Sequence, residues 1–100
     1  MRGIVIDPGA KPELYRLPDP LQELQRFMGG YAQRCPISNR FAALFYLPQA
    51  GQSLPTRHYQ GRWFYGRLCL VGWRNARMTD LPMPLAEELL QKFTPVEVTP

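Results

Sequence analysis

One stretch of twelve residues, from Arg62 to Trp73, constrains the fold more than any other part of the chain. Its sequence is RWFYGRLCLVGW, and large apolar or aromatic residues fall on both of its alternating faces. A strand of this kind is typical of the middle of a sheet, with helices or loops covering each side. Gly66 and Gly72 indicate a bulge or a close backbone approach within it. We therefore expect a central β-strand over residues 62–73.

Shorter apolar or alternating runs predict four further strands. They lie at residues 2–7, 13–17, 31–35 and 41–47, and each run ends at proline or at typical turn residues. The segment 48–61 is expected to be irregular, and a loop of this length in a compact domain is more often functional or mobile than merely connective. Another turn is expected at Asn75-Ala76-Arg77.

A first helix is expected to begin at Asp19-Pro20. The Asp19 side chain can cap the free amides of a first turn, and Pro20 suits the first helical position. Apolar residues then recur at spacings of three and four along one face. Gly29-Gly30 is expected to end this helix in a left-handed cap.

A second helix is expected from about residue 81 to residue 93, where leucines and a final phenylalanine recur every four residues. Thr79 or Asp80 is expected to cap it. Together the elements predict an α+β fold: a single domain over residues 1–100, with a mostly antiparallel five-stranded sheet in the order ββαβββα. We expect both helices to pack on one face of the sheet, which leaves the other face for the arginines and part of the aromatic residues.

The charged residues are distributed unevenly along the chain. The net charge is +4, yet no aspartate or glutamate occurs in the 56 residues between Glu23 and Asp80. All eight cations in this acid-free segment are arginines, which pair with phosphate or carboxylate in a planar, bidentate way and stack on aromatic rings. They are Arg26, Arg34, Arg40, Arg57, Arg62, Arg67, Arg74 and Arg77.

Two interpretations of the acid-free segment stay open. In one, the aromatic residues form the core, and the arginines are solvated and pair with the acidic ends of the chain. In the other, arginines and aromatics form a surface for an acidic partner, which is a nucleic acid or an acidic protein. The candidate binding residues are Arg34, Arg57, Arg62, Arg67, Arg74, Arg77, Trp63 and Tyr65.

The sequence carries no recognisable catalytic or metal-binding pattern. His58 is the only histidine, and the acid-free segment around it offers no carboxylate to orient it, so we interpret it as a surface loop residue. Cys35 and Cys69 lack metal-ligand spacing, and no glycine-rich phosphate loop is present. We therefore predict no catalytic residue, no metal site and no cofactor.

The order of several landmarks resembles a known group of proteins. The strand running into Asp7-Pro8-Gly9, the helix ending in Gly29-Gly30-Tyr31, the strand from Gly66 to Gly72 and the helix from Thr79-Asp80-Leu81 to Phe93 together resemble the small bacterial, plasmid and phage proteins grouped as domain of unknown function 3846. The resemblance covers about residues 3–93. It implies a small cytosolic accessory protein often linked to mobile elements, and it implies no activity.

This chain departs from that group in its charges. Members carry acids after Gly-Gly-Tyr and around the middle loop, where this chain has Gln33-Arg34 and Arg57-His58. The arginine-rich middle is therefore not implied by the resemblance.

The chain is expected to be cytoplasmic. No apolar run approaches the roughly 20 residues of a membrane helix, and the first seven residues contain an acid and no cleavage site of a signal peptide. Cys35 and Cys69 are then expected to be free thiols. We predict a non-enzymatic binding protein without a membrane partner. The alternative is a homo-oligomeric structural module, such as a homodimer, whose self-interface is formed by exposed Trp63, Tyr65 or Trp73.

Overall fold

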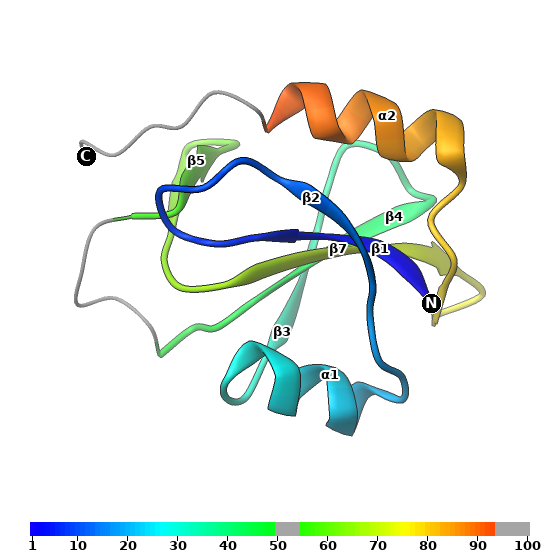
Figure 1. Ribbon diagram of the computed structural model, residues 1–100, viewed down its shortest axis with the longest axis horizontal. Helices are drawn as coiled ribbons and strands as arrows, with labels where there is room; N and C mark the ends of the chain where they lie inside the picture. Colours follow the sequence, from blue (N-terminus) through cyan, green and yellow to red (C-terminus); the bar gives the residue numbers. More distant parts are fainter. Residues whose placement is uncertain (50–54, 94–100) are drawn as a thin grey trace.

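The centre of the molecule is an antiparallel sheet in which β7 lies in the middle (Figure 1). The computed structural model describes residues 1–49 and 55–93. The strands of the sheet run in the order β2-β1-β7-β4-β3, and each of these pairings is antiparallel. Their bounds are β1 (Arg2–Ile6), β2 (Glu13–Arg16), β3 (Gln33–Pro36), β4 (Ala42–Tyr46) and β7 (Leu68–Arg74). The α+β prediction is confirmed, because the structure combines two helices with a mostly antiparallel sheet.

Three short strands were not predicted. β5 (Arg57–Tyr59) and β6 (Arg62–Phe64) form a separate two-stranded sheet, and β8 (Arg77–Thr79) pairs with the last residues of β7. The prediction of one strand over 62–73 is wrong, because Gly66 has a φ of 75° and separates β6 from β7. The expected irregular segment 48–61 contains β5, and its residues 50–54 lie outside the described residues.

The two helices, α1 (Leu21–Met28) and α2 (Met83–Lys92), lie on opposite faces of the sheet (Figure 1). The prediction that both helices pack on one face is therefore wrong. The physical reason lies in β7, whose buried residues point alternately to either face, so that both faces need an apolar cover. In the described part of the chain, no helix is long and apolar enough to cross a membrane.

Each helix closes its own core cluster. On the α2 side, the cluster includes Leu44, Leu68, Leu70, Leu81, Ala86, Leu89 and Phe93. On the α1 side, the cluster includes Leu24, Met28, Ala43, Phe45, Cys69 and Val71. β4 and β7 contribute alternate residues to both clusters, so these two strands connect the two halves of the core.

The helix ends differ in part from the predicted ones. The N-cap residues are Pro20 and Pro82, and neither helix has a side-chain cap, so Asp19 and Thr79 do not serve as predicted. The Asp80 carboxylate instead accepts a hydrogen bond of 2.7 Å from the backbone N–H of Arg2. Gly29 ends α1 with a φ of 101°, as predicted.

Gly72 is required by a close backbone approach. A Cβ atom at this position would collide with the backbone carbonyl of Asp80. The segment that follows β8 therefore crosses directly over the end of β7. The β7–β8 hairpin, residues 72–79, belongs to the same sheet, because β8 pairs with the end of β7.

Candidate functional site

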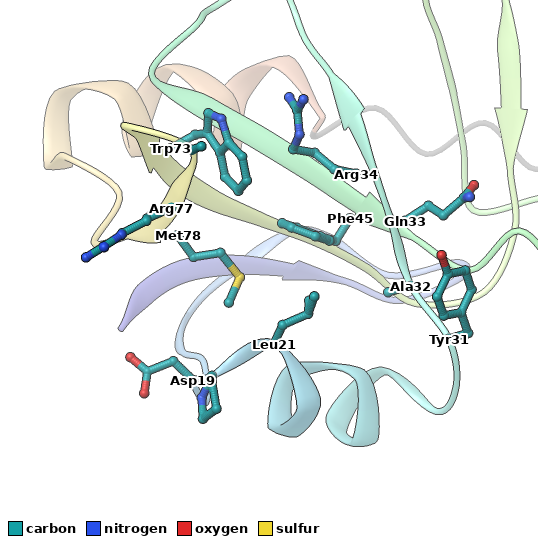
Figure 2. Close-up of a pocket in the computed structure, with 12 residues that line it drawn as sticks. Asp19, Leu21, Tyr31, Ala32, Gln33, Arg34, Phe45, Trp73, Arg77 and Met78 are labelled. Atoms are coloured by element: carbon teal, nitrogen blue, oxygen red, sulfur yellow. The ribbon is translucent and has the colours of Figure 1, made fainter.

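A groove of about 770 Å³ opens on the α1 side of the sheet (Figure 2). It lies between the start of α1, the residues that enter β3 and the β7–β8 hairpin. Phe45, Trp73 and Met78 contribute its apolar lining, and its volume is within the roughly 300–1,000 Å³ that is common for ligand sites. In Figure 2, Leu21, Phe45 and Met78 point toward the middle of this groove.

The groove exists because α1 covers only part of the sheet. Trp73 follows Cys69 and Val71 at a spacing of two, so its side chain belongs to the same face as theirs. That face is sealed at Cys69 and Val71, whereas Trp73 is only half-buried. Trp73 packs against Phe45 with ring centroids 6.2 Å apart, and Met78 is its cross-strand neighbour in the hairpin. The apolar face therefore continues into the open groove.

Arg34 lies on the indole ring of Trp73. Its guanidinium carbon is 4.7 Å from the ring centroid, a distance at which the cation and the ring attract each other. Arg34 reaches this face because it pairs in register with Phe45 of β4. The side chain is exposed, so the stacked pair of Arg34 and Trp73 presents a flat, positively charged surface at the groove.

The β7–β8 hairpin places two arginines directly opposite each other. Its turn residues, Asn75 and Ala76, have φ values of 52° and 60°, as a tight turn of type I′ requires. Arg74 and Arg77 are then register partners, and both are exposed. Like charges at directly opposed positions destabilise a strand pair. The predicted turn at this place is confirmed, except that Arg77 already belongs to β8.

A second hollow, of about 530 Å³, adjoins the groove at this hairpin. It is lined by Arg74, Asn75, Arg77, Met78 and Thr79, and it shares Arg77 and Met78 with the groove. Both hollows together therefore offer an apolar part and a strongly cationic part. The carboxylate at the groove belongs to Asp19, on the other side from Arg34 (Figure 2).

Arg57 is not available to a partner. Its side chain is 2% exposed and donates hydrogen bonds to the carbonyl oxygens of Ala10, Thr56 and Phe93. Burial lowers the pKa of Arg57. Its assignment to the binding surface is therefore corrected: Arg57 joins three parts of the chain from within.

Arg67 forms an ion pair far from the groove, at the other end of β7. Its Nε lies 2.7 Å from Oδ1 of Asp7, and a second nitrogen lies 3.2 Å from Oδ2. The hydrogen bonds that Arg67 donates to the Asp7 carboxylate raise the pKa of Arg67. The guanidinium also lies over the ring of Phe27, at 4.5 Å, and donates to its carbonyl oxygen. Arg67 therefore holds the end of β1 to the end of α1.

The remaining candidates lie apart from the groove. Arg62 stacks on Tyr46 and Phe64, which belong to the α2 side, and hydrogen bonding with the Tyr46 side chain raises the pKa of Arg62. Trp63 packs against exposed His58 with ring centroids 4.5 Å apart, and Tyr65 is half-buried in the connection before β7. Of the eight candidate residues, Arg34 and Arg77 line the groove, and Arg74 lies opposite Arg77 in the adjoining hairpin.

The three-dimensional arrangement adds residues that sequence reasoning did not assign to this site. Asp19, Tyr31, Phe45, Trp73 and Met78 all line the groove. A signal for Trp73 was present, since it shares the alternation of Cys69 and Val71. Tyr31 and Asp19 come from other segments, and no local pattern connects them with the hairpin.

The two arginines of the acid-free segment without a described partner both lie in the β7–β8 hairpin. Of the eight arginines in the acid-free segment, six make an ion pair, a side-chain hydrogen bond or a ring contact. Arg74 and Arg77 make none of these with any residue in the ranges 1–49 and 55–93. No described residue therefore forms an ion pair with either of these two opposed arginines.

The described cysteines and the other possible metal ligands lie apart from one another. No group of three histidine, cysteine, aspartate or glutamate side chains among the described residues could hold a metal ion. Cys35 and Cys69 are free, and burial raises the pKa of the Cys69 thiol to about 12, so this thiol stays protonated at neutral pH.

Comparisons of the chain with protein-family models, with curated proteins and with solved structures find no match.

Proposed function

We propose that the protein is a non-enzymatic binding protein that engages an acidic partner, a nucleic acid or an acidic protein, at the groove and the β7–β8 hairpin. The observation that supports this function is the direct opposition of Arg74 and Arg77. Such a pair costs the hairpin about 0.2–1 kcal/mol, and no described residue neutralises it. An anion bound between the two guanidinium groups relieves this repulsion.

The backbone at the hairpin supports the same conclusion. Ala76 adopts a left-handed conformation that costs an L-residue other than glycine about 1–2 kcal/mol. Strain of this kind is often concentrated at functional sites. Ala76 lines the groove beside Arg77. The hairpin thus combines strained backbone with unbalanced charge.

The wider biological setting belongs to the same proposal. The free thiols of Cys35 and Cys69 agree with a reducing compartment such as the cytoplasm. The order of landmarks that resembles the mobile-element proteins suggests an accessory role there.

Binding to two labelled polyanions tests the proposal. We expect a single-stranded oligonucleotide or polyglutamate to bind in 50 mM salt with a Kd below about 10⁻⁴ M, and to bind more weakly as salt rises. The double variant Arg74→Glu/Arg77→Glu should lose this binding. Fluorescence anisotropy measures it.

A matched control makes the same charge change elsewhere. Lys11→Glu/Arg16→Glu alters two exposed cations near and within β2. It should retain most of the affinity. If both polyanions bind more weakly than about 10⁻⁴ M, or if the control loses as much affinity as the hairpin variant, the proposed function is wrong.

Self-association is a second candidate function, and β2 supports it better than the tryptophans do. β2 is an edge strand in which all four residues are exposed, including Leu14 and Tyr15. Open strand edges favour pairing with a second chain. Light scattering at increasing concentration should show a dimer that Leu14→Lys abolishes, and a monomer at all concentrations would remove this candidate.

A further inference from the structure

We infer that the acidic partner is a single-stranded nucleic acid, with unpaired bases lying in the groove and phosphates at the β7–β8 hairpin. This inference rests on the proposed function, because it names the partner of the same site. It is carried by three features of the groove: its flat surfaces, the position of its cations and the carboxylate of Asp19 in its described lining.

The flat surfaces suit nucleobases. Tyr31 lies at one side of the groove and is 64% exposed, although it is aromatic. On another side, the exposed guanidinium of Arg34 is already stacked on Trp73. Bases of single strands stack on aromatic rings and on guanidinium planes, and each such contact is worth about 1–3 kcal/mol. A polyglutamate chain has no ring to place on them.

The cations lie next to the groove, where they can contact the phosphates of a strand whose bases lie in it. Arg74 and Arg77 line the hollow that adjoins the groove, and Asn75 lies between them in the turn. Two guanidinium groups form strong bidentate hydrogen bonds with phosphate oxygens. In Figure 2, Arg77 extends from the hairpin away from the apolar lining. The bases therefore have the apolar part of the site, and the phosphates have the cationic part.

Asp19 favours a nucleic acid over an acidic protein as the partner. Its exposed carboxylate lines the groove and repels the side chains of an acidic peptide. The same carboxylate accepts hydrogen bonds from the amino groups of cytosine, adenine or guanine. Thymine and uracil have no such amino group. The groove should therefore prefer cytosine-containing strands over thymine-containing ones.

The decisive experiment compares chains that share a backbone charge and differ in their bases. The probes are a labelled cytosine oligonucleotide of about eight nucleotides, within the usual range of single-strand sites, an abasic phosphodiester of equal length and a polyglutamate of equal charge. We expect the cytosine strand to bind about 5- to 150-fold more tightly than the abasic chain. A thymine strand should lie between the two, and a blunt duplex should bind more weakly than the single strand.

The outcomes separate this inference from the proposed function. If the abasic chain or the polyglutamate binds as tightly as the cytosine strand, the partner is not a single-stranded nucleic acid, while an acidic partner at the groove still stands. A duplex that binds as tightly as the single strand also overturns the inference. If none of the probes binds, both the inference and the proposed function are wrong.

Two variants test the assigned roles. Tyr31→Leu removes an exposed ring, so the fold should persist while affinity for the cytosine strand falls about 5- to 150-fold and affinity for the abasic chain stays the same. Tyr15→Leu is the matched control, because Tyr15 is 47% exposed on β2 and does not line the groove. Arg77→Gln should weaken the binding of both the cytosine strand and the abasic chain. It should also reduce the slope of log K against log salt concentration by about 0.7. An equal loss for both chains in Tyr31→Leu would contradict the stacking role.

Discussion

The two faces of the sheet are built from the same strands, but the α2 side is closed and the α1 side stays partly open. On the α2 side, the ten residues of α2 and the β5–β6 hairpin contribute to a core cluster in which Leu44, Leu68 and Leu70 are fully buried. On the α1 side, α1 has only eight residues, and the apolar face runs on past it to half-buried Trp73. The comparison shows that a short cover, rather than a special strand, leaves the groove open.

The largest effect should come from the closed face. Leu70→Ala removes a side chain that is 0% exposed at the centre of the α2-side cluster. We expect the free energy of unfolding to fall by about 2–5 kcal/mol. Leu21→Ala, at the groove, should cost less than about 1 kcal/mol because Leu21 is 40% exposed. Urea denaturation measures both, and equal losses would refute the contrast between the faces.

The arginines should show the same contrast at a smaller scale. Arg57→Gln breaks the hydrogen bonds that the buried guanidinium donates to carbonyl groups, and bonds of charged donors are worth about 1.5–3 kcal/mol. Arg77→Gln, on the open hairpin, should change stability by less than about 0.5 kcal/mol. Thermal unfolding of the two variants under the same conditions tests this order. A larger loss in Arg77→Gln would mean that the hairpin cation is structural.

A reversal of sign is expected for Arg77→Glu. The new carboxylate faces Arg74 across the hairpin, so an attractive pair replaces a repulsive one. Stability should rise by about 0.2–1 kcal/mol while affinity for polyanions falls. Measured together, Tm and anisotropy should move in opposite directions. If Tm and affinity both decrease, the opposition of Arg74 and Arg77 does not destabilise the native protein.

The smallest effect concerns acid stability at the link between the hairpin and α2. The hydrogen bond from the Arg2 N–H lowers the pKa of Asp80 below its ordinary 3.8. The native state therefore favours the carboxylate, and its contribution is present above the ordinary pKa and lost as pH falls through the lowered one. Asp80→Asn should flatten the dependence of Tm on pH below about 4. An unchanged slope would remove Asp80 as a cause.

Much of the fold followed from local pattern. Five strands and two helices lie close to their predicted residues, because apolar periodicity and turn residues such as Gly29 act over a few positions. β5, β6 and β8 have three residues each and are too short to show a period. The helix faces could not be assigned from the helices themselves. The alternation of apolar residues within 68–73 already required a cover on both sides of the sheet, and it predicts the placement of the helices better than the helix sequences do.

The candidate site was less accessible to such reasoning. Arg74 and Arg77 are close in sequence, so a hairpin at Asn75-Ala76 predicts their opposition once the register is known. Tyr31 and Asp19 reach the groove only through packing of distant segments. In the sequence, Arg57 looks like the other arginines of the acid-free segment, and only its burial in the structure distinguishes it from them. Charge patterning therefore identified an arginine-rich segment and did not separate its structural arginines from its free ones.

The buried Arg57 also has a consequence for folding kinetics. Its hydrogen bonds to Phe93 and Ala10 span 36 and 47 residues of sequence, so the segments that it joins must already be in place when they form. Contacts that form after the transition state influence unfolding more than folding. Changes at Arg57 should therefore accelerate unfolding and leave the refolding rate nearly constant. The stretch expected to be a loop would then set the lifetime of the native state.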